Sequence, residues 1–148
     1  MRRIRSWWDA DRGDAALEAV LLAPALLMLL ILAIVAGRFY TAQSAVAEAA
    51  RAAARSASLA TDGATAAAVA QTRASSVLAA QGLQCSSLTV VVDTADFAIP
   101  VGQTGYVTAT VTCEVRFSDL VTPGLAVPGS RTASASFRSP IDRYGPHP

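Results

Sequence analysis

The sequence contains no lysine, one histidine and two cysteines, and these shortages limit the chemistry open to the chain. The single histidine, His147, lies near the C-terminus, so a paired-histidine metal motif cannot be formed. The sequence also has no CxxC pair and no glycine-rich phosphate loop. We therefore predict no catalytic, cofactor-binding or metal-binding residues, no small-molecule substrate, and a protein that is not an enzyme.

Charged residues are also scarce, at 16% of the chain, with a formal net charge of +1. The arginines cluster only within the first dozen residues, so the sequence lacks the basic surface that nucleic-acid binding requires. The best candidates for binding a cation are Asp93 and Asp96. Two acids beside a turn are usually just solvated, so we predict no calcium site there.

One feature is abundant: an uncharged apolar run from Ala19 to Ala36. As a helix it would be about 27 Å long, close to the thickness of a bilayer's hydrocarbon core. Pro24 lies inside the run; a membrane helix tolerates proline, and we expect a local kink there. Four arginines precede the run and predict a cytoplasmic N-terminus. They are Arg2, Arg3, Arg5 and Arg12.

A cleaved secretory signal peptide is the main alternative to a membrane anchor. The apolar region of a signal peptide usually spans about 7–15 residues, which is shorter than this run. Small residues follow the run at Ala42, Ala45 and Ala47, so conventional cleavage there stays open as an alternative.

Glu18 is an acid at the inner edge of the apolar run, where a charged group is costly. The simplest interpretation is that it complements the positive end of the helix dipole. Its spacing suggests more, because Gly13 lies five residues earlier, after a basic leader. This is the pattern of a type IV prepilin, in which a peptidase cuts after the glycine. Asp14 would then carry the new amine, which the Glu18 carboxylate could neutralise in a low-dielectric setting.

A longer stretch resembles the N-terminal region of TadE-like proteins, minor pilins or pseudopilins of the tight-adherence (Flp) pilus system. Beside the leader pattern, the matching features are Pro24 within the leucine-rich run, Gly37-Arg38, and an alanine-rich helix. That helix carries Ala50-Arg51 and Ala54-Arg55. The resemblance covers about a third of the chain and is more specific than any of its parts.

The resemblance implies a single-pass protein of the bacterial cytoplasmic membrane that acts through protein contacts in pilus biogenesis and adhesion. Its implied partners are other pilins, Tad assembly proteins, a prepilin peptidase and membrane lipid, and its C-terminal domain is expected outside the cytoplasm or in a surface pilus. The alternative is an uncleaved signal-anchor protein whose β-domain binds a cell-envelope ligand unrelated to pili.

Beyond the membrane, the alanine-rich segment from Thr41 to Ala60 predicts that the helix continues. Its small-residue face could pack on a neighbouring pilin or, the interpretation we favour, on the chain's own β-domain. That face consists of Val46, Ala50, Ala53 and Ala57. A break with a capping residue at 61–63 precedes a second helix from about residue 64 to residue 80, and Gly82 is expected to stop it.

Period-two alternation predicts three strands after the second helix. Leu88, Val90 and Val92 share a face of the first strand, and residues 106–117 form the clearest one. The third strand surrounds Ala135 and follows a long loop at residues 118–130. The expected fold class is α+β, pilin-like in outline: a long N-terminal helix, a second helix and a small antiparallel sheet of about three strands.

These patterns divide the chain into a basic cytoplasmic leader (1–13), a transmembrane helix (14–38) and its extension outside the membrane (39–60). A small α+β domain (61–139) and a flexible tail (140–148) follow. Cys85 and Cys113 both lie in the domain, where an oxidising compartment favours a disulfide of about 3 kcal/mol. Because the parity of Cys85 differs from that of Leu88, Cys85 must precede the strand or follow a bulge. Two buried free thiols are the alternative.

Overall fold

A computed structural model describes residues 7–100, 102–116, 118 and 128–142, with side chains described from Val20 onward apart from Leu21. The chain divides into two compact units, Met1–Gly37 and Arg38–Pro148. We call them the N-terminal unit and the C-terminal unit.

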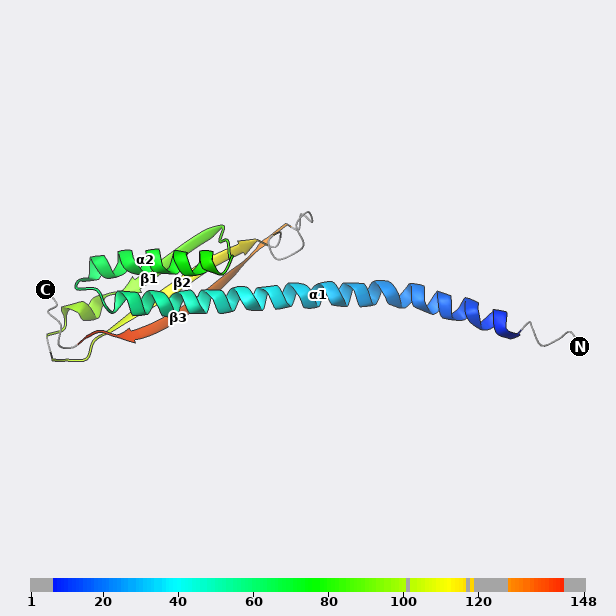
Figure 1. The fold of residues 1–148 in the computed structure, drawn as a ribbon, viewed down its shortest axis with the longest axis horizontal. Helices are drawn as coiled ribbons and strands as arrows, with labels where there is room; N and C mark the ends of the chain where they lie inside the picture. The colour runs from blue at the N-terminus through cyan, green and yellow to red at the C-terminus, as the bar shows by residue number, and fades with distance from the viewer. Residues whose placement is uncertain (1–6, 101, 117, 119–127, 143–148) are drawn as a thin grey trace, which may run out of the picture. The chain divides into compact units, whose positions relative to one another are not determined.

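Two helices open the chain (Figure 1). Helix α1 runs from Trp7 to Ala57, which confirms the predicted continuation past the apolar run. Helix α2 runs from Gly63 to Ala80. Asp62 caps α2, because its carboxylate accepts a hydrogen bond of 2.8 Å from the Thr65 N–H. Past the end of α2, Gly82 has a φ of 68°, a left-handed conformation that glycine adopts without strain.

Three strands form an antiparallel sheet in the order β1-β2-β3. They are β1 (Ser87–Asp93), β2 (Tyr106–Arg116) and β3 (Ser130–Pro140), and a short 3-10 helix, η1 (Ala95–Ala98), lies between the first two. The register places Leu88, Cys113 and Ala133 side by side across the sheet. The predicted α+β fold with a three-stranded antiparallel sheet is confirmed.

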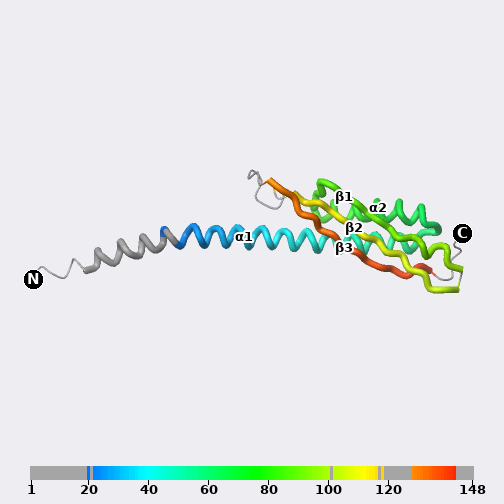
Figure 2. Tube along the Cα trace, turned by 180° about the vertical axis from the view of Figure 1, so that it is seen from behind, coloured from blue at the N-terminus to red at the C-terminus, as the bar shows by residue number. Residues whose placement is uncertain are grey.

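The alternation of β2 directs one face of the sheet into the core. Val107, Ala109, Val111 and Cys113 are each 0% exposed, whereas the residues between them are partly exposed. The helices of the C-terminal unit cover this face, and strand β1 contacts α2 (Figure 2). The core is therefore one layer of valine and alanine between sheet and helices.

The opposite face of the sheet carries hydroxyl side chains in place of apolar ones. Thr110 Oγ1 donates a hydrogen bond of 3.1 Å to Ser136 Oγ, and the hydroxyls of Thr112 and Ser134 lie 3.1 Å apart. Pairs of this kind stabilise neighbouring strands on a solvated face. This polar face is why the sequence alternates so clearly between residues 106 and 116.

The end of the domain lies later than the expected boundary at residue 139. Pro140 is the last residue of β3, and Ile141 is only 6% exposed. The Ile141 N–H also donates to the Gly105 carbonyl at 3.0 Å. Pro140 and Ile141 therefore belong to the domain and not to the tail, because an apolar contact and a backbone hydrogen bond hold them. Residues 143–148, with His147, and most of the expected 118–130 loop lie outside the described residues.

Candidate functional site

The three residues of the predicted prepilin pattern, Gly13, Asp14 and Glu18, all lie within α1. The helix begins at Trp7, six residues before Gly13, so the Gly13–Asp14 peptide bond belongs to helical backbone. Glycine is the residue that least favours a helix interior after proline, by about 1 kcal/mol relative to alanine. A peptidase that reads this bond would therefore have to unwind the start of the helix, and Gly13 lowers the cost of doing so.

The apolar run forms the middle of α1, with Pro24 inside the helix. Among the described residues, Leu22–Ala57 is the one helical stretch long and apolar enough to cross a membrane. None of its most apolar window is buried by the rest of the chain, and Met28 is 76% exposed. A row of exposed leucines and isoleucines of this length needs an apolar environment, which a bilayer provides.

The small-residue face of α1 is occupied by the chain itself. Val46, Ala53 and Ala57 are each 0% exposed, and Ala50 is 1% exposed. They share one buried cluster with residues of α2 and the sheet. The interpretation that this face packs on the chain's own domain is thus the correct one, and the face is not open to a neighbouring pilin.

Helix α2 supplies a partner surface that our sequence interpretation missed. Its buried residues recur every fourth position: Ala66, Ala70, Ala74 and Leu78. The first three are each 0% exposed. The i, i+4 spacing of these residues was readable from the sequence, since it marks one face of a helix. These residues belong to the same buried cluster as the small-residue face of α1.

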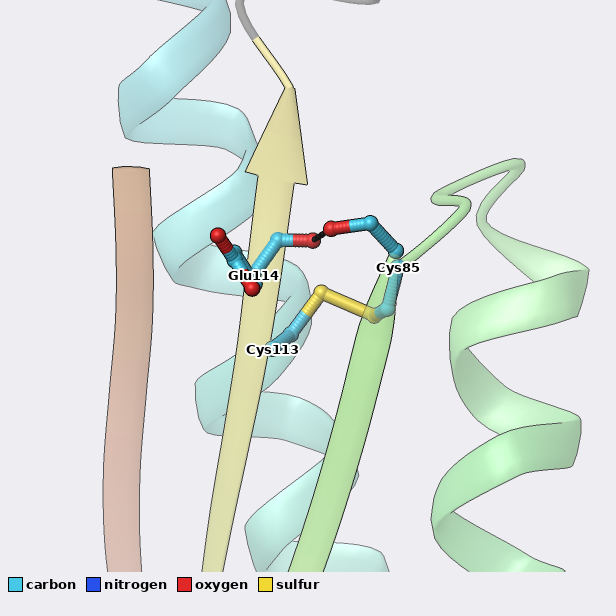
Figure 3. Close-up of a disulfide and its surroundings, with 4 residues drawn as sticks. Cys85, Cys113 and Glu114 are labelled. Atoms are coloured by element: carbon cyan, nitrogen blue, oxygen red, sulfur yellow. Dashed lines mark hydrogen bonds between the residues drawn. A yellow bond between two sulfur atoms is a disulfide. The ribbon is translucent and has the colours of Figure 1, made fainter. Parts of the chain in front are cut away.

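Cys85 and Cys113 form a disulfide with a Cα–Cα distance of 5.3 Å (Figure 3). Cys85 lies two residues before β1, as its parity required, whereas Cys113 lies on the buried face of β2. A backbone hydrogen bond joins the same two segments next to the disulfide, because the Ser86 N–H donates to the Glu114 carbonyl at 2.8 Å. The disulfide therefore joins the start of the sheet to the middle strand.

The two acids considered as cation ligands serve as backbone acceptors. Asp93 Oδ1 accepts from the Ala95 N–H at 3.1 Å, and Asp96 Oδ2 accepts from the Tyr106 N–H at 2.9 Å. These bonds hold the turn around η1 and the start of β2. Within the described residues, no group of three or more histidine, cysteine, aspartate or glutamate side chains is arranged to hold a metal ion.

Fold and site together define an α+β protein with one N-terminal helix able to cross a membrane and a disulfide-bonded sheet domain. Residues 13–55 match the family model described as TadE-like protein, which confirms the resemblance for this segment. The match links the chain to pilus-associated structural proteins of the Tad system. No curated protein and no solved structure matches the chain.

Proposed function

We propose that this protein is a membrane-anchored minor pilin, pseudopilin or assembly protein of a Tad (Flp) type IV pilus. One observation carries the proposal. The family match begins at Gly13, the residue after which cleavage is predicted, and it includes Glu18 and the whole apolar run. The matched segment is thus the one that a pilin uses for anchoring and assembly.

In the proposed mechanism, a prepilin peptidase removes residues 1–13 and leaves Asp14 with a free amine. The amine is cationic near neutral pH and lies four residues before the Glu18 carboxylate in the sequence. One helical turn separates the two positions, so the carboxylate can neutralise the amine of its own chain or that of a neighbouring subunit. The ion pair would orient subunits as they enter the pilus.

Two features of the C-terminal unit support an anchor over a cleaved signal peptide. Cleavage near Ala47 would remove Ala42, Ala45 and Val46, each at most 3% exposed, from the core. Loss of Val46 alone would forfeit about 1.5–3 kcal/mol of buried apolar surface. The second feature is the disulfide, because disulfides persist in oxidising compartments. It therefore supports a position of the domain outside the cytoplasm.

The replacement Glu18→Ala tests the proposed role of the carboxylate. We expect normal amounts of the protein in the membrane but few pili on the cell surface, because Asp14 would lose its counter-charge. Glu18→Gln should behave like the alanine variant, since the charge is what matters. Immunoblots of membranes and pilus counts by electron microscopy measure the two effects.

Glu48→Ala is the matched control. It removes an exposed carboxylate from the same helix, one that pairs with Arg51 at 3.1 Å. We expect this control to leave piliation unchanged, because an exposed pair contributes little. Normal piliation in both Glu18 variants would remove Glu18 from the mechanism.

A further inference from the structure

The end of the C-terminal unit that follows the apolar run collects three arginines. Arg38 lines a cleft with Gln81 and Leu83, at the C-terminal end of α2. The Arg131 guanidinium, at the start of β3, lies 5.6 Å from the centroid of the Phe39 ring. Arg116 ends β2 and lines a second cleft there. We call Arg38, Arg116 and Arg131 the basic end.

Among the described residues, the basic end has no partner that neutralises its charges. All three arginines are exposed, and within the described residues none of them forms an ion pair. Of the acids in the described part of the chain, Glu114 lies nearby, and its carboxylate accepts a hydrogen bond from the Ser130 hydroxyl. Among the described residues, this end therefore carries three arginines and one glutamate.

The opposite end of the unit carries charges of both signs, because Arg138 shares a row of the sheet with Asp93 and Arg55 lies in the last turn of α1. It carries four aspartates: Asp62, Asp93, Asp96 and Asp142. Contacts between distant segments bring them to one end. Asp96 accepts a hydrogen bond from the Tyr106 N–H at the start of β2. Gly63, which follows Asp62, lies against Thr94, which follows Asp93: a Cβ on Gly63 would be 3.0 Å from the Thr94 side chain. The Ile141 N–H, next to Asp142, binds the Gly105 carbonyl.

The covalent chain determines what the basic end meets. The apolar run ends at Ala36, and Arg38 follows two residues later. In the anchored protein Arg38 must lie at the level of the lipid headgroups, and Phe39 brings Arg131 to the same level. Tyr40, 79% exposed, is an aromatic residue of the kind enriched at membrane interfaces.

We propose that the basic end binds the phosphates of anionic phospholipids, so that the C-terminal unit itself recognises the membrane surface. Arginine suits this ligand, because its planar guanidinium donates two parallel hydrogen bonds to a phosphate. The proposal rests on the membrane anchor and not on the role in pili. The occupant that competes with lipid is a second copy of the chain, through the end that carries the four aspartates.

The full-length protein in vesicles provides the test. Spin-labelled phosphatidylglycerol and phosphatidylcholine report which lipid is enriched around the protein. We compare the wild type, the triple variant R38Q/R116Q/R131Q, the charge-keeping variant R38K/R116K/R131K, and the control R55Q/R73Q/R138Q. The control removes three exposed arginines that lie elsewhere on the same unit. The N-terminal arginines are present in all four proteins, so their contribution cancels.

We expect the preference of the triple glutamine variant for phosphatidylglycerol to fall about fivefold for each arginine that reaches a phosphate in the wild type. The lysine variant and the control should keep most of it, and 1 M salt should reduce the wild-type preference strongly. Circular dichroism checks that all four proteins are equally folded. Equal lipid preference in the triple variant and the control would overturn the proposal. A triple variant that keeps its lipid preference but no longer self-associates would also overturn the proposal.

Discussion

Asp62 shows how one side chain sets the boundary between two helices. Its carboxylate accepts hydrogen bonds from the Thr65 N–H at 2.8 Å and from the Thr65 hydroxyl at 2.7 Å. These bonds, the backbone one first, lower the pKa of Asp62 below its ordinary value of 3.8. The ionised carboxylate is therefore the form that stabilises the fold. Its contribution is complete above that ordinary value and is lost as the pH falls through the lowered pKa of the folded state.

We predict that Asp62→Ala lowers the melting temperature of the C-terminal unit by a few degrees at neutral pH. The difference from the wild type should persist down to about pH 4 and shrink below it. Asp62→Asn should retain much of the cap, because an amide oxygen also accepts the Thr65 N–H, but without the pH dependence. Thermal unfolding of the full chain in neutral detergent measures all three proteins. A difference that grows below pH 4 would contradict the assigned role.

At this scale, residues whose role depends on near neighbours were predictable. The cap at Asp62 and the offset of Cys85 both follow from spacing along the chain. The stacking of Arg131 on Phe39 and the hydrogen bond from Gln43 Nε2 to the Ser134 carbonyl were not predictable. Each joins residues about ninety positions apart, and no periodicity in a single sequence records such a pair.

At the scale of elements, α1 and α2 contribute mostly alanine to the buried cluster of the C-terminal unit. Ala53 of α1 and Ala70 of α2 are both 0% exposed, and protein interiors are packed closely enough for a longer side chain to disturb its neighbours. Valine and leucine make up little of this contribution.

We predict that Ala70→Leu destabilises the C-terminal unit by about 1–3 kcal/mol, because the added carbons must displace the residues packed around this buried position. Ala67→Leu is the matched control: position 67 is exposed on the same helix, and leucine is a good helix former. Denaturant unfolding gives both free energies. If Ala70→Leu proves as stable as Ala67→Leu, the packing described for α2 is wrong.

The elements themselves were largely predictable, because each has a clear period. Strand β2 alternates strictly, and α1 and α2 are bounded by turn and capping residues. The partner of the small-residue face was harder to predict, since alanine at helical spacing suits an intramolecular and an intermolecular neighbour equally. Only the fold shows that the face is filled.

At the scale of the whole molecule, the disulfide links segments 28 residues apart and limits the freedom of the unfolded chain. We predict that the double variant C85S/C113S loses about 3 kcal/mol of unfolding free energy. A reducing agent should lower the stability of the wild type to a similar degree and leave the double variant unaffected. Unfolding with and without reductant compares the two. Wild-type stability that does not respond to complete reduction would contradict a stabilising role.

The division of the chain into an anchor and a domain is the basis of the proposed function. The boundary between the two compact units falls between Gly37 and Arg38, where the apolar run ends and the charged residues resume. The sequence predicts an anchor followed by a domain, because a bilayer-length apolar run is a strong signal. It does not determine whether residues 1–13 stay attached, since that depends on a peptidase.

The intact mass of the protein isolated from membranes tests the central claim most directly. The account predicts a chain that begins at Asp14, keeps the apolar run and stays in the membrane fraction. A chain that begins between Ala42 and Ala47 and is released from the membrane would contradict both the anchor and the leader. A chain intact from Met1 would contradict the processing step.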